Sequence, residues 1–423
     1  MTVGSGVAIS IHANGVYRAA RRKPVCRSGV SRLNGITTFA FGGRSRSIPI
    51  MKDGLSVDFG YPKVAYAIAI PARDEERRVE HCLDACRRAM DGWSQNGIIT
   101  VLVNNSCDHT ARRALAWARR NASPLRLAEC RFSAAEAHAG NARRAALDFA
   151  RAHVTAEGWL LTTDADSQPA PDWIGANLAP LADGRAAMVC GFVDLDAAEF
   201  ARLPSWIVER DAAEDRYRRT ALELASLLDP DMLNPWPFHG IISGASLAMS
   251  AAAYDRVGGA PIVPCGEDRA LVRRFLAHDL PVLYADAPRV VTSGRLDGRA
   301  PGGMADTIAS RLAGEAHRCD EELEPAHRTW FRASLRGRLR RSLRDQRQCD
   351  AALSEAALSR EQMRTARTFT RFGQLWAFVE HASPRLTRRR MLWEEMMAEL
   401  PRLETFRDHA ARAAAPSPAG ETA

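Results

Sequence analysis

Two aspartates one residue apart, Asp164 and Asp166, are the residues whose types and spacing most clearly indicate chemistry. They follow a short apolar run, residues 158–163, that is typical of a buried strand. In an extended backbone both carboxylates would point to the same face, where they repel each other unless a cation joins them. Mg²⁺ uses one or two carboxylates together with phosphate oxygens, so the pair indicates a metal site for a phosphorylated ligand. The alternative is a solvated turn in which Asp166 and Ser167 cap a helix.

The segments around this pair alternate between strands and helices. Apolar runs predict strands at residues 64–70, 98–103 and 125–131 and a fourth leading into Asp164, with helices at 74–90, 111–121 and 141–153. Such alternation predicts right-handed βαβ units and a mostly parallel sheet. Ligands collect at the carboxyl ends of the strands in such sheets. We therefore expect residues 72–75, Asn104, Asn105 and the aspartate pair to converge.

Several short motifs along the chain resemble those of family 2 glycosyltransferases of the GT-A fold. They lie, in the family's order, at residues 70–76, 104–110, 140–143, 164–166, 243–249, 254–259 and 266–268. The resemblance runs from about residue 64 to about residue 292. It implies the GT-A nucleotide-diphospho-sugar transferase fold, an α/β fold with a Rossmann-like, mostly parallel sheet.

The resemblance also implies a set of donor-binding residues. The base and ribose of a nucleotide-diphosphate sugar would lie against residues 72–75 and the turn at Asn105. Asp166 would hold Mn²⁺ or Mg²⁺ on the diphosphate, with Asp164 on the ribose or the metal. The full set that the resemblance implies is Pro71, Ala72, Arg73, Glu75, Asn105, Asp108, Asn141, Arg143, Asp164 and Asp166.

Catalysis is implied for the acidic pair Glu267 and Asp268. Asp268 would take the proton from the acceptor hydroxyl as it attacks the anomeric carbon and inverts it. Glu267 could position the loop or a substrate hydroxyl. The alternative is an ordinary helix N-terminus, where the helix dipole favours acidic residues. The Gln-x-x-Arg-Trp motif of processive synthases is absent from the sequence, so the expected product carries one added sugar.

The chain departs from the family pattern at two places. The second-strand turn usually presents Asp, whereas this chain has Asn104 and Asn105, so the preference for the base stays open. The histidine that often completes the metal site has no evident counterpart in residues 291–299.

Two further segments could bind a substrate. Arg295 and Arg299 lie among glycines, and arginine forks grip phosphate oxygens in pairs, so this segment could be a mobile lid on the diphosphate. Its alternative is a solvated basic loop. Trp236, in the stiff turn at residues 235–240, could stack on a sugar or lipid acceptor, although such aromatic residues more often simply pack.

The net charge of +8 belongs to the N-terminal segment. Residues 1–50 contain eight basic residues and no acidic one, and the remaining 50 basic residues equal the 50 acidic ones. A nucleic-acid-binding surface on the folded body is therefore not expected. The segment could be a disordered arm, an organellar transit peptide, or sequence upstream of a true start at Met51. Nine scattered cysteines without a CxxC pair, and no apolar run long enough to span a membrane, favour a reduced, cytoplasmic protein.

Composition and pattern predict five parts. They are a disordered N-terminal arm at 1–60, a donor-binding half at 61–190, an acceptor-binding half with the acid pair at 191–305, a helical extension at 306–412, and a disordered tail at 413–423. The extension could cover the active site, form a homodimer, or contact a membrane surface through its arginines. Its mixed charge favours a packed or dimeric role.

Three other functions compete with the glycosyltransferase. A sugar-1-phosphate nucleotidylyltransferase shares the βαβ plan but needs a Gly-rich loop after the first strand, and residues 72–75 contain no glycine. A haloacid-dehalogenase-type phosphatase needs Thr or Val where this chain has Gln168. The third is a catalytically inactive GT-A-fold binding module, against which the intact acidic residues at 164, 166, 267 and 268 argue.

Overall fold

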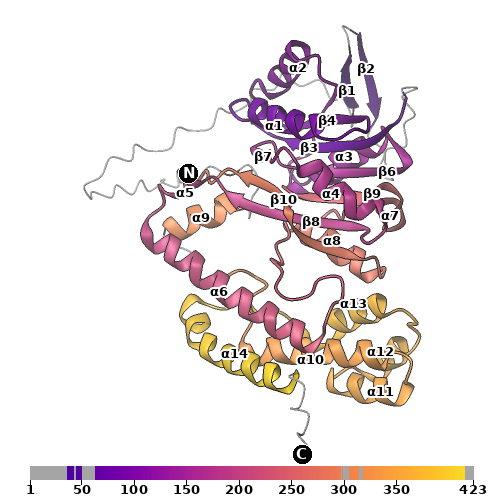
Figure 1. Cartoon of the computed structure of the whole chain (residues 1–423), viewed down its shortest axis with the longest axis vertical. Helices are drawn as coiled ribbons and strands as arrows, with labels where there is room; N and C mark the ends of the chain where they lie inside the picture. The colour runs from indigo at the N-terminus through magenta and orange to yellow at the C-terminus, as the bar shows by residue number, and fades with distance from the viewer. Residues whose placement is uncertain are drawn as a thin grey trace, which may run out of the picture. The chain divides into compact units, whose positions relative to one another are not determined.

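The computed structural model describes residues 36–41, 44–49, 62–296, 298, 304–313 and 318–414. The chain divides into two units, and the first, Met1–Leu33, lies outside the described residues. Every element below belongs to the second unit, Asn34–Ala423 (Figure 1). Arg299 and residues 415–423 also lie outside the described residues, so the expectations for them stay untested.

A ten-stranded sheet forms the centre of the second unit, in the order β2-β1-β5-β4-β3-β6-β9-β8-β10-β7. Its strands are β1 (Ile36–Phe41), β2 (Arg44–Pro49), β3 (Val64–Ala72), β4 (Gly97–Asn104), β5 (Leu125–Cys130), β6 (Val154–Thr162), β7 (Ser167–Pro169), β8 (Met188–Leu195), β9 (Leu247–Ser250) and β10 (Val282–Thr292). The strands β5, β4, β3 and β6 pair in parallel, as do β8 and β10. The short strand β9 is antiparallel to both of its neighbours, β6 and β8. The predicted parallel core of the sheet is present.

Helices cover both faces of this sheet. On one side lie α1 (Val79–Asp91), α2 (Thr110–Arg120) and α4 (Trp173–Ala182); on the other lie α3 (Ala139–Arg151), α7 (Ala251–Arg256) and α8 (Glu267–Ala277). Strand β3 serves both cores: Tyr66, Ile68 and Ile70 pack in the first, and Ala67 and Ala69 pack in the second. Side chains alternate across a strand, so a strand covered on both faces must be apolar throughout.

Two predicted helix starts differ from the structure. The helix expected at 74–90 begins at Val79, because Asp74 has a left-handed φ of 54° and the backbone N–H groups of residues 74–76 bond to the neighbouring turn. The last helix, expected to follow an N-cap at Thr387, is α14 (Trp393–Ala414). Leu392 pairs with Arg318 in an isolated bridge, so the chain before α14 is extended.

The helical region comprises α9 (Met304–Leu312), α10 (Ala326–Ser342), α11 (Gln346–Glu355), α12 (Arg360–Ala366), α13 (Phe372–Ala382), a 3₁₀ turn (Pro384–Leu386) and α14. Helices α10 to α13 share one core, which includes Phe331, Leu335 and Leu353. A second core joins α14 to the long helix α6 (Ser205–Leu228) through Tyr217 and Leu403 (Figure 1). A short helix, α5 (Ala197–Phe200), precedes α6.

The N-terminal arm and the cysteines differ in part from expectation. Strand β1 pairs with β2 and, through Thr38 and Phe39, with β5, so residues 36–41 and 44–49 join the sheet although an arm outside the fold was expected. Seven cysteines of the described residues have free thiols, but Cys107 is disulfide-bonded. No helix among the described residues is long and apolar enough to cross a membrane.

Candidate active site

The turns after β3 and β4 are bound to each other at the carboxyl edge of the sheet. Three consecutive N–H groups of the first turn donate to side chains of the second: Asp74 to Ser106 Oγ (3.0 Å), Glu75 to Thr110 Oγ1 (2.7 Å) and Glu76 to Asp108 Oδ2 (2.9 Å). These bonds hold the Glu75 side chain in place, and it is only 5% exposed. The predicted convergence of the two turns is therefore present.

Asp108 and Asn105, two predicted donor-binding residues, bond mainly to the protein itself. Asp108 also accepts from the backbone N–H (2.9 Å) and the hydroxyl (2.6 Å) of Thr110. The Asn105 amide donates to the carbonyl of Phe132 (2.8 Å) and accepts from its N–H (3.0 Å). Asn105 has a φ of 50°, a left-handed conformation that asparagine tolerates better than most residues. Both side chains shape the wall of the site.

Arg143, on α3, connects the end of β6 with the start of α8. Its guanidinium donates to Asp164 Oδ1 (2.5 Å) and Thr162 Oγ1 (2.8 Å), and its Nε lies 3.6 Å from Glu267 Oε1. Burial alone would lower the pKa of Arg143, but Asp164 and Glu267 raise it, so the side chain stays charged. A Cβ on Gly244 would lie 2.2 Å from Arg143 Nη2, which explains the glycine there.

Arg295 lies between two carboxylates of the predicted donor site. Its guanidinium donates to both oxygens of Glu75 (2.7 and 2.5 Å), and Nη2 lies 3.0 Å from Asp166 Oδ2. Burial raises the pKa of Asp166 to about 6; Arg295 lowers it in part, while Asp164 raises it further. Two buried carboxylates in contact with one cation make this a place that favours positive charge.

Glu199, which the sequence analysis did not single out, holds the segment that carries Arg295. It accepts from the hydroxyl of Ser293 (2.8 Å) and from Arg78 Nη2 (2.8 Å). The Arg295 N–H in turn donates to Ser293 Oγ (3.1 Å). The only local signal was the Asp196-x-x-Glu199 spacing of a helix start, which indicates a cap and not a site.

The donor set fits a divalent ion that is shared with a phosphorylated ligand. In the part of the chain that the structure describes, no three His, Cys, Asp or Glu side chains form a cluster that could hold a metal by themselves. Mg²⁺ needs no such cluster, because it keeps several waters and takes phosphate oxygens. One oxygen of Asp164 accepts from Arg143, and one oxygen of Asp166 lies beside Arg295. The second oxygen of each carboxylate is left for a metal. The Arg295 guanidinium, which lies beside Asp166, shows that this carboxylate can have a cation next to it.

Asp268 lies at the start of α8, after the left-handed Gly266 (φ 69°). Its Oδ2 accepts from the Gly244 N–H (3.1 Å) and its Oδ1 from the Arg269 N–H (2.7 Å). The side chain is half-buried, so its carboxylate is oriented yet partly open. Burial raises the pKa of the neighbouring Glu267; Arg143 opposes this shift and Asp268 adds to it.

The remaining predicted donor residues vary in position. Pro71 and Ala72 are the last residues of β3, and Arg73 is half-buried just beyond them. Asn141 belongs to the cap of α3, where its amide donates to the carbonyl of Glu136 (2.9 Å) and its N–H to His138 Nδ1 (3.4 Å). Its side chain is thus bonded within its own turn.

Known proteins resemble this chain in part. Residues 67–223 match the family model described as "Glycosyl transferase family 2". This range covers β3 to α6 and ends before Gly244, Glu267 and Asp268. This segment is therefore similar to family 2 glycosyltransferases, and the α/β sheet with a helical C-terminal region agrees with the fold class expected from the sequence. No curated protein matches the chain.

Three solved structures give the range of similarity. TarS 1-349 of S. aureus in complex with UDP-GlcNAc is 14% identical, with 74% of this chain and 89% of that chain covered and a TM-score of 0.40. The mannosyltransferase PcManGT from Pyrobaculum calidifontis, in complex with GDP-Man and Mn²⁺, is 15% identical over 87% and 80% of the two chains, with a TM-score of 0.40. Glucosyl-3-phosphoglycerate synthase from Mycobacterium tuberculosis, with Mn²⁺, UDP and phosphoglyceric acid, is 18% identical over 60% and 78%, with a TM-score of 0.35. Superpositions this distant do not locate single residues.

Proposed function

We propose that this chain transfers one sugar from a nucleotide-diphosphate sugar to a hydroxyl group of an acceptor, with inversion at the anomeric carbon. The observation that carries this proposal is the position of Arg143. Its guanidinium contacts Asp164 at the end of β6 and lies 3.6 Å from Glu267 at the start of α8. One of the predicted donor-side aspartates and one member of the predicted acid pair thus lie beside the same buried cation, as a two-substrate transferase requires.

In this proposal the donor lies along the carboxyl edge of the sheet. The base and ribose contact Pro71, Ala72 and Arg73, and the diphosphate lies near Asp166. Asp166, with Asp164 beside it, would hold Mn²⁺ or Mg²⁺, which would screen the charge that develops on the leaving diphosphate. Arg295 exchanges its two bonds to Glu75 for bonds to the diphosphate, because a guanidinium fork fits phosphate and carboxylate alike.

The transfer step assigns the proton to Asp268. The acceptor oxygen forms a bond to the anomeric carbon on the face opposite the diphosphate, while the bond from that carbon to the diphosphate oxygen breaks. The electron pair of the broken bond leaves with the nucleoside diphosphate, and the hydroxyl proton passes to the Asp268 carboxylate. The N–H groups of Gly244 and Arg269 orient this carboxylate toward the acceptor.

A panel of UDP- and GDP-sugars tests the proposal. Full-length protein is incubated with each donor, with Mn²⁺ or with EDTA, and release of nucleoside diphosphate is measured. We expect at least one donor to be consumed with Mn²⁺ and none with EDTA. Release of sugar 1-phosphate and nucleoside triphosphate, on addition of pyrophosphate, would instead indicate a nucleotidylyltransferase. Binding of a donor without turnover would instead indicate a catalytically inactive binding module.

A further inference from the structure

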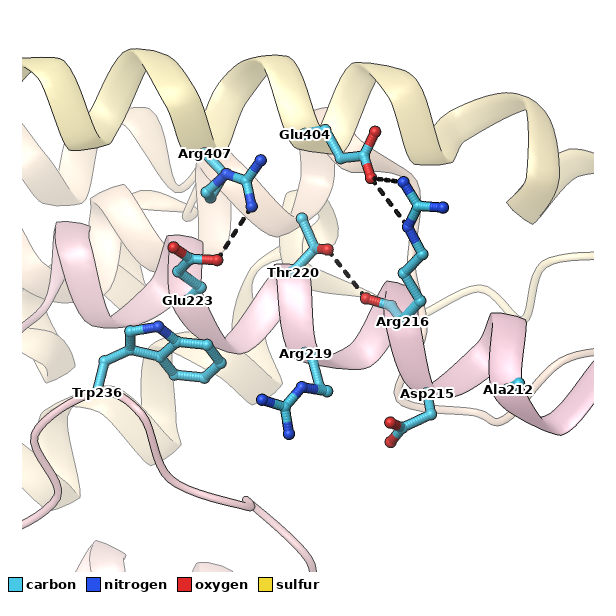
Figure 2. A pocket seen from close by; sticks show the side chains of 9 residues that line it. All are labelled: Ala212, Asp215, Arg216, Arg219, Thr220, Glu223, Trp236, Glu404 and Arg407. Atoms are coloured by element: carbon cyan, nitrogen blue, oxygen red, sulfur yellow. Dashed lines mark hydrogen bonds and ion pairs between the residues drawn. The ribbon is translucent and has the colours of Figure 1, made fainter.

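A cleft with a volume of about 480 Å³ lies between α6 and α14, away from the aspartates of the donor site (Figure 2). The residues that matter for its chemistry are Arg216, Arg219 and Glu223 on α6, Glu404 and Arg407 on α14, and Trp236 on the loop after α6. The volume is within the range of small-ligand pockets, but charged side chains dominate the lining. A polar ligand therefore fits the cleft better than an apolar one.

The acidic side chains of the cleft already have cationic partners. Arg216 Nη2 lies 2.6 Å from Glu404 Oε1, and Arg407 Nη1 lies 3.1 Å from Glu223 Oε2 (Figure 2). Asp215, which also lines the cleft, lies 3.3 Å from Arg218. The first two of these ion pairs join α6 to α14 and hold the two walls together. They also leave lone pairs on the carboxylates, which can accept bonds from hydroxyl groups of a ligand.

Arg219 differs from the other arginines of the cleft. Within residues 62–296 and 318–414 no carboxylate forms an ion pair or hydrogen bond with it. Its guanidinium carbon lies 5.9 Å from the centroid of the Trp236 indole, and its side chain is exposed. The cleft is lined by as many acidic residues as arginines, but the N–H groups of Arg219 have no carboxylate partner among these residues and are therefore available to a ligand.

Trp236 supplies a flat apolar surface beside this charge. Its ring is half-buried, packs edge-on against Phe238 at a centroid distance of 6.1 Å, and faces the cleft (Figure 2). An indole combines a large apolar face with low conformational freedom, so the C–H face of a sugar ring can stack on it at little entropic cost. The loop that carries Trp236 continues to Gly244, whose N–H bonds to Asp268.

We infer that this cleft binds an anionic saccharide, with its carboxylate or phosphate on Arg219, its ring on Trp236 and its hydroxyl groups on Glu223 and Glu404. The inference rests on the proposed function in one respect: it takes this saccharide to be part of the acceptor. Arg219 can form a paired, charge-assisted contact to either acid group. A neutral sugar would leave that guanidinium unmatched, so the cleft should discriminate against it.

Ligand-observed NMR on the full-length protein tests the binding. The probes are glucose 6-phosphate and glucuronate as anionic sugars, glucose as the neutral sugar, and inorganic phosphate as the anion without a ring. We expect both anionic sugars to bind, and glucose to bind at least about tenfold more weakly, as the loss of one charge-assisted bond requires. Arg219→Gln should weaken the anionic sugars by a similar factor. Arg119→Gln, at an exposed position on α2 and outside the cleft, should leave them unchanged.

The aromatic part of the site has its own pair of variants. Trp236→Ala should abolish the binding effects that ligand-observed NMR detects on the ring protons of both anionic sugars. Trp236→Phe should restore most of these effects. Glucose binding as tightly as glucuronate, or an Arg219→Gln protein with wild-type affinity, would overturn the inference. If inorganic phosphate displaced both sugars and bound with the same affinity as glucose 6-phosphate, the cleft would be a site for anions, and the proposal that it recognises a saccharide would be wrong.

The binding assay needs no donor and no turnover, so the two proposals can fail separately. If the protein consumed a nucleotide-sugar but bound no anionic saccharide, only the cleft proposal would be contradicted. If the protein bound anionic saccharides but consumed no donor, only the proposed function would be contradicted. Melting curves of all four variants establish that loss of binding is not loss of folding.

Discussion

At the scale of single residues, the carboxylates of the donor site outnumber the arginines beside them. Glu75 and Asp166 share Arg295, and Asp164 contacts Arg143. The site therefore keeps an excess of negative charge that favours a further cation. A divalent ion and a diphosphate can enter together, because they bring opposite charges and Arg295 can turn from Glu75 to the phosphate.

The raised pKa of Asp166 predicts a pH dependence of metal binding. Its pKa is about 6, mainly because the side chain is buried, and the proton competes with the metal for the carboxylate. Mn²⁺ affinity should be constant above about pH 6 and fall about tenfold per unit below it. Calorimetric titrations of Mn²⁺ in the presence of a nucleotide-diphosphate sugar between pH 5 and pH 8 measure this, because the phosphates of such a donor, unlike a terminal phosphate, do not titrate near about pH 6. Affinity that stays flat down to pH 5 would contradict it.

Some residues of the site could be predicted from the sequence and others could not. Asp164 and Asp166 follow an apolar run, so their place at a strand end is a local property of the sequence. The contact of Arg295 with Glu75 joins residues 220 positions apart, and no local pattern encodes it. The same holds for the side chain of Asn105, whose amide bonds to Phe132 because β4 and β5 are neighbours in the sheet.

At the scale of elements, the segment that precedes α10 contacts the residue that follows the predicted acid pair at the start of α8. Arg269 follows Asp268, and its guanidinium donates to Asp320 at 2.8 Å and 3.3 Å. The carboxylate of Asp268 accepts from the N–H groups of Gly244 and Arg269. Gly244 lies just before β9, and the Arg269 side chain is held by its ion pair with Asp320. Asp320 is thus a positioning residue for Asp268 in this account.

Removing the Asp320 carboxylate should slow transfer without weakening the donor. We expect Asp320→Asn to lower kcat several-fold, up to about tenfold, because a misplaced base loses part of its effect. The donor affinity should stay at the wild-type value, since the donor residues lie on β3, β6 and the Arg295 segment. Asp350→Asn is the matched control: Asp350 also pairs with an arginine, Arg367, but at an exposed position on α11. Equal kcat in the two variants would remove the positioning role.

At the scale of the whole molecule, the helical region is bound to the acceptor-side half along α6 and beyond the end of α8. The core shared by α6 and α14 contains Tyr217 and Leu403, and the Gly373 N–H at the start of α13 donates to Asp279 at 2.6 Å, beyond the end of α8. Periodicity predicted that helices follow residue 306, because amphipathic spacing is local. It could not predict that they pack on α6, because that depends on which apolar faces meet.

The hairpin of β1 and β2 makes a testable contribution to the fold. It joins the edge of the sheet at β5 through only two residue pairs, and every predicted site residue lies after it in the chain. A chain that begins at Met51 should therefore fold and bind the nucleoside diphosphate with Mn²⁺ as the full chain does. Calorimetry of both chains at one pH is the measurement. A Met51 chain that fails to fold, or binds at least tenfold more weakly, would show that the hairpin supports the site.

In the proposed mechanism, donor binding and proton removal belong to different residues of one site. The variant Asp268→Asn separates these two roles. Turnover of any donor and acceptor pair found should fall about 10²–10⁴-fold, because asparagine keeps the shape of the side chain but cannot accept the proton. Affinity for the donor with Mn²⁺ should not change, whereas Asp166→Ala should lose that affinity without unfolding. Asp255→Asn, an exposed acid paired with Arg151, is the control with wild-type turnover. Wild-type turnover in Asp268→Asn would contradict the inverting mechanism proposed here.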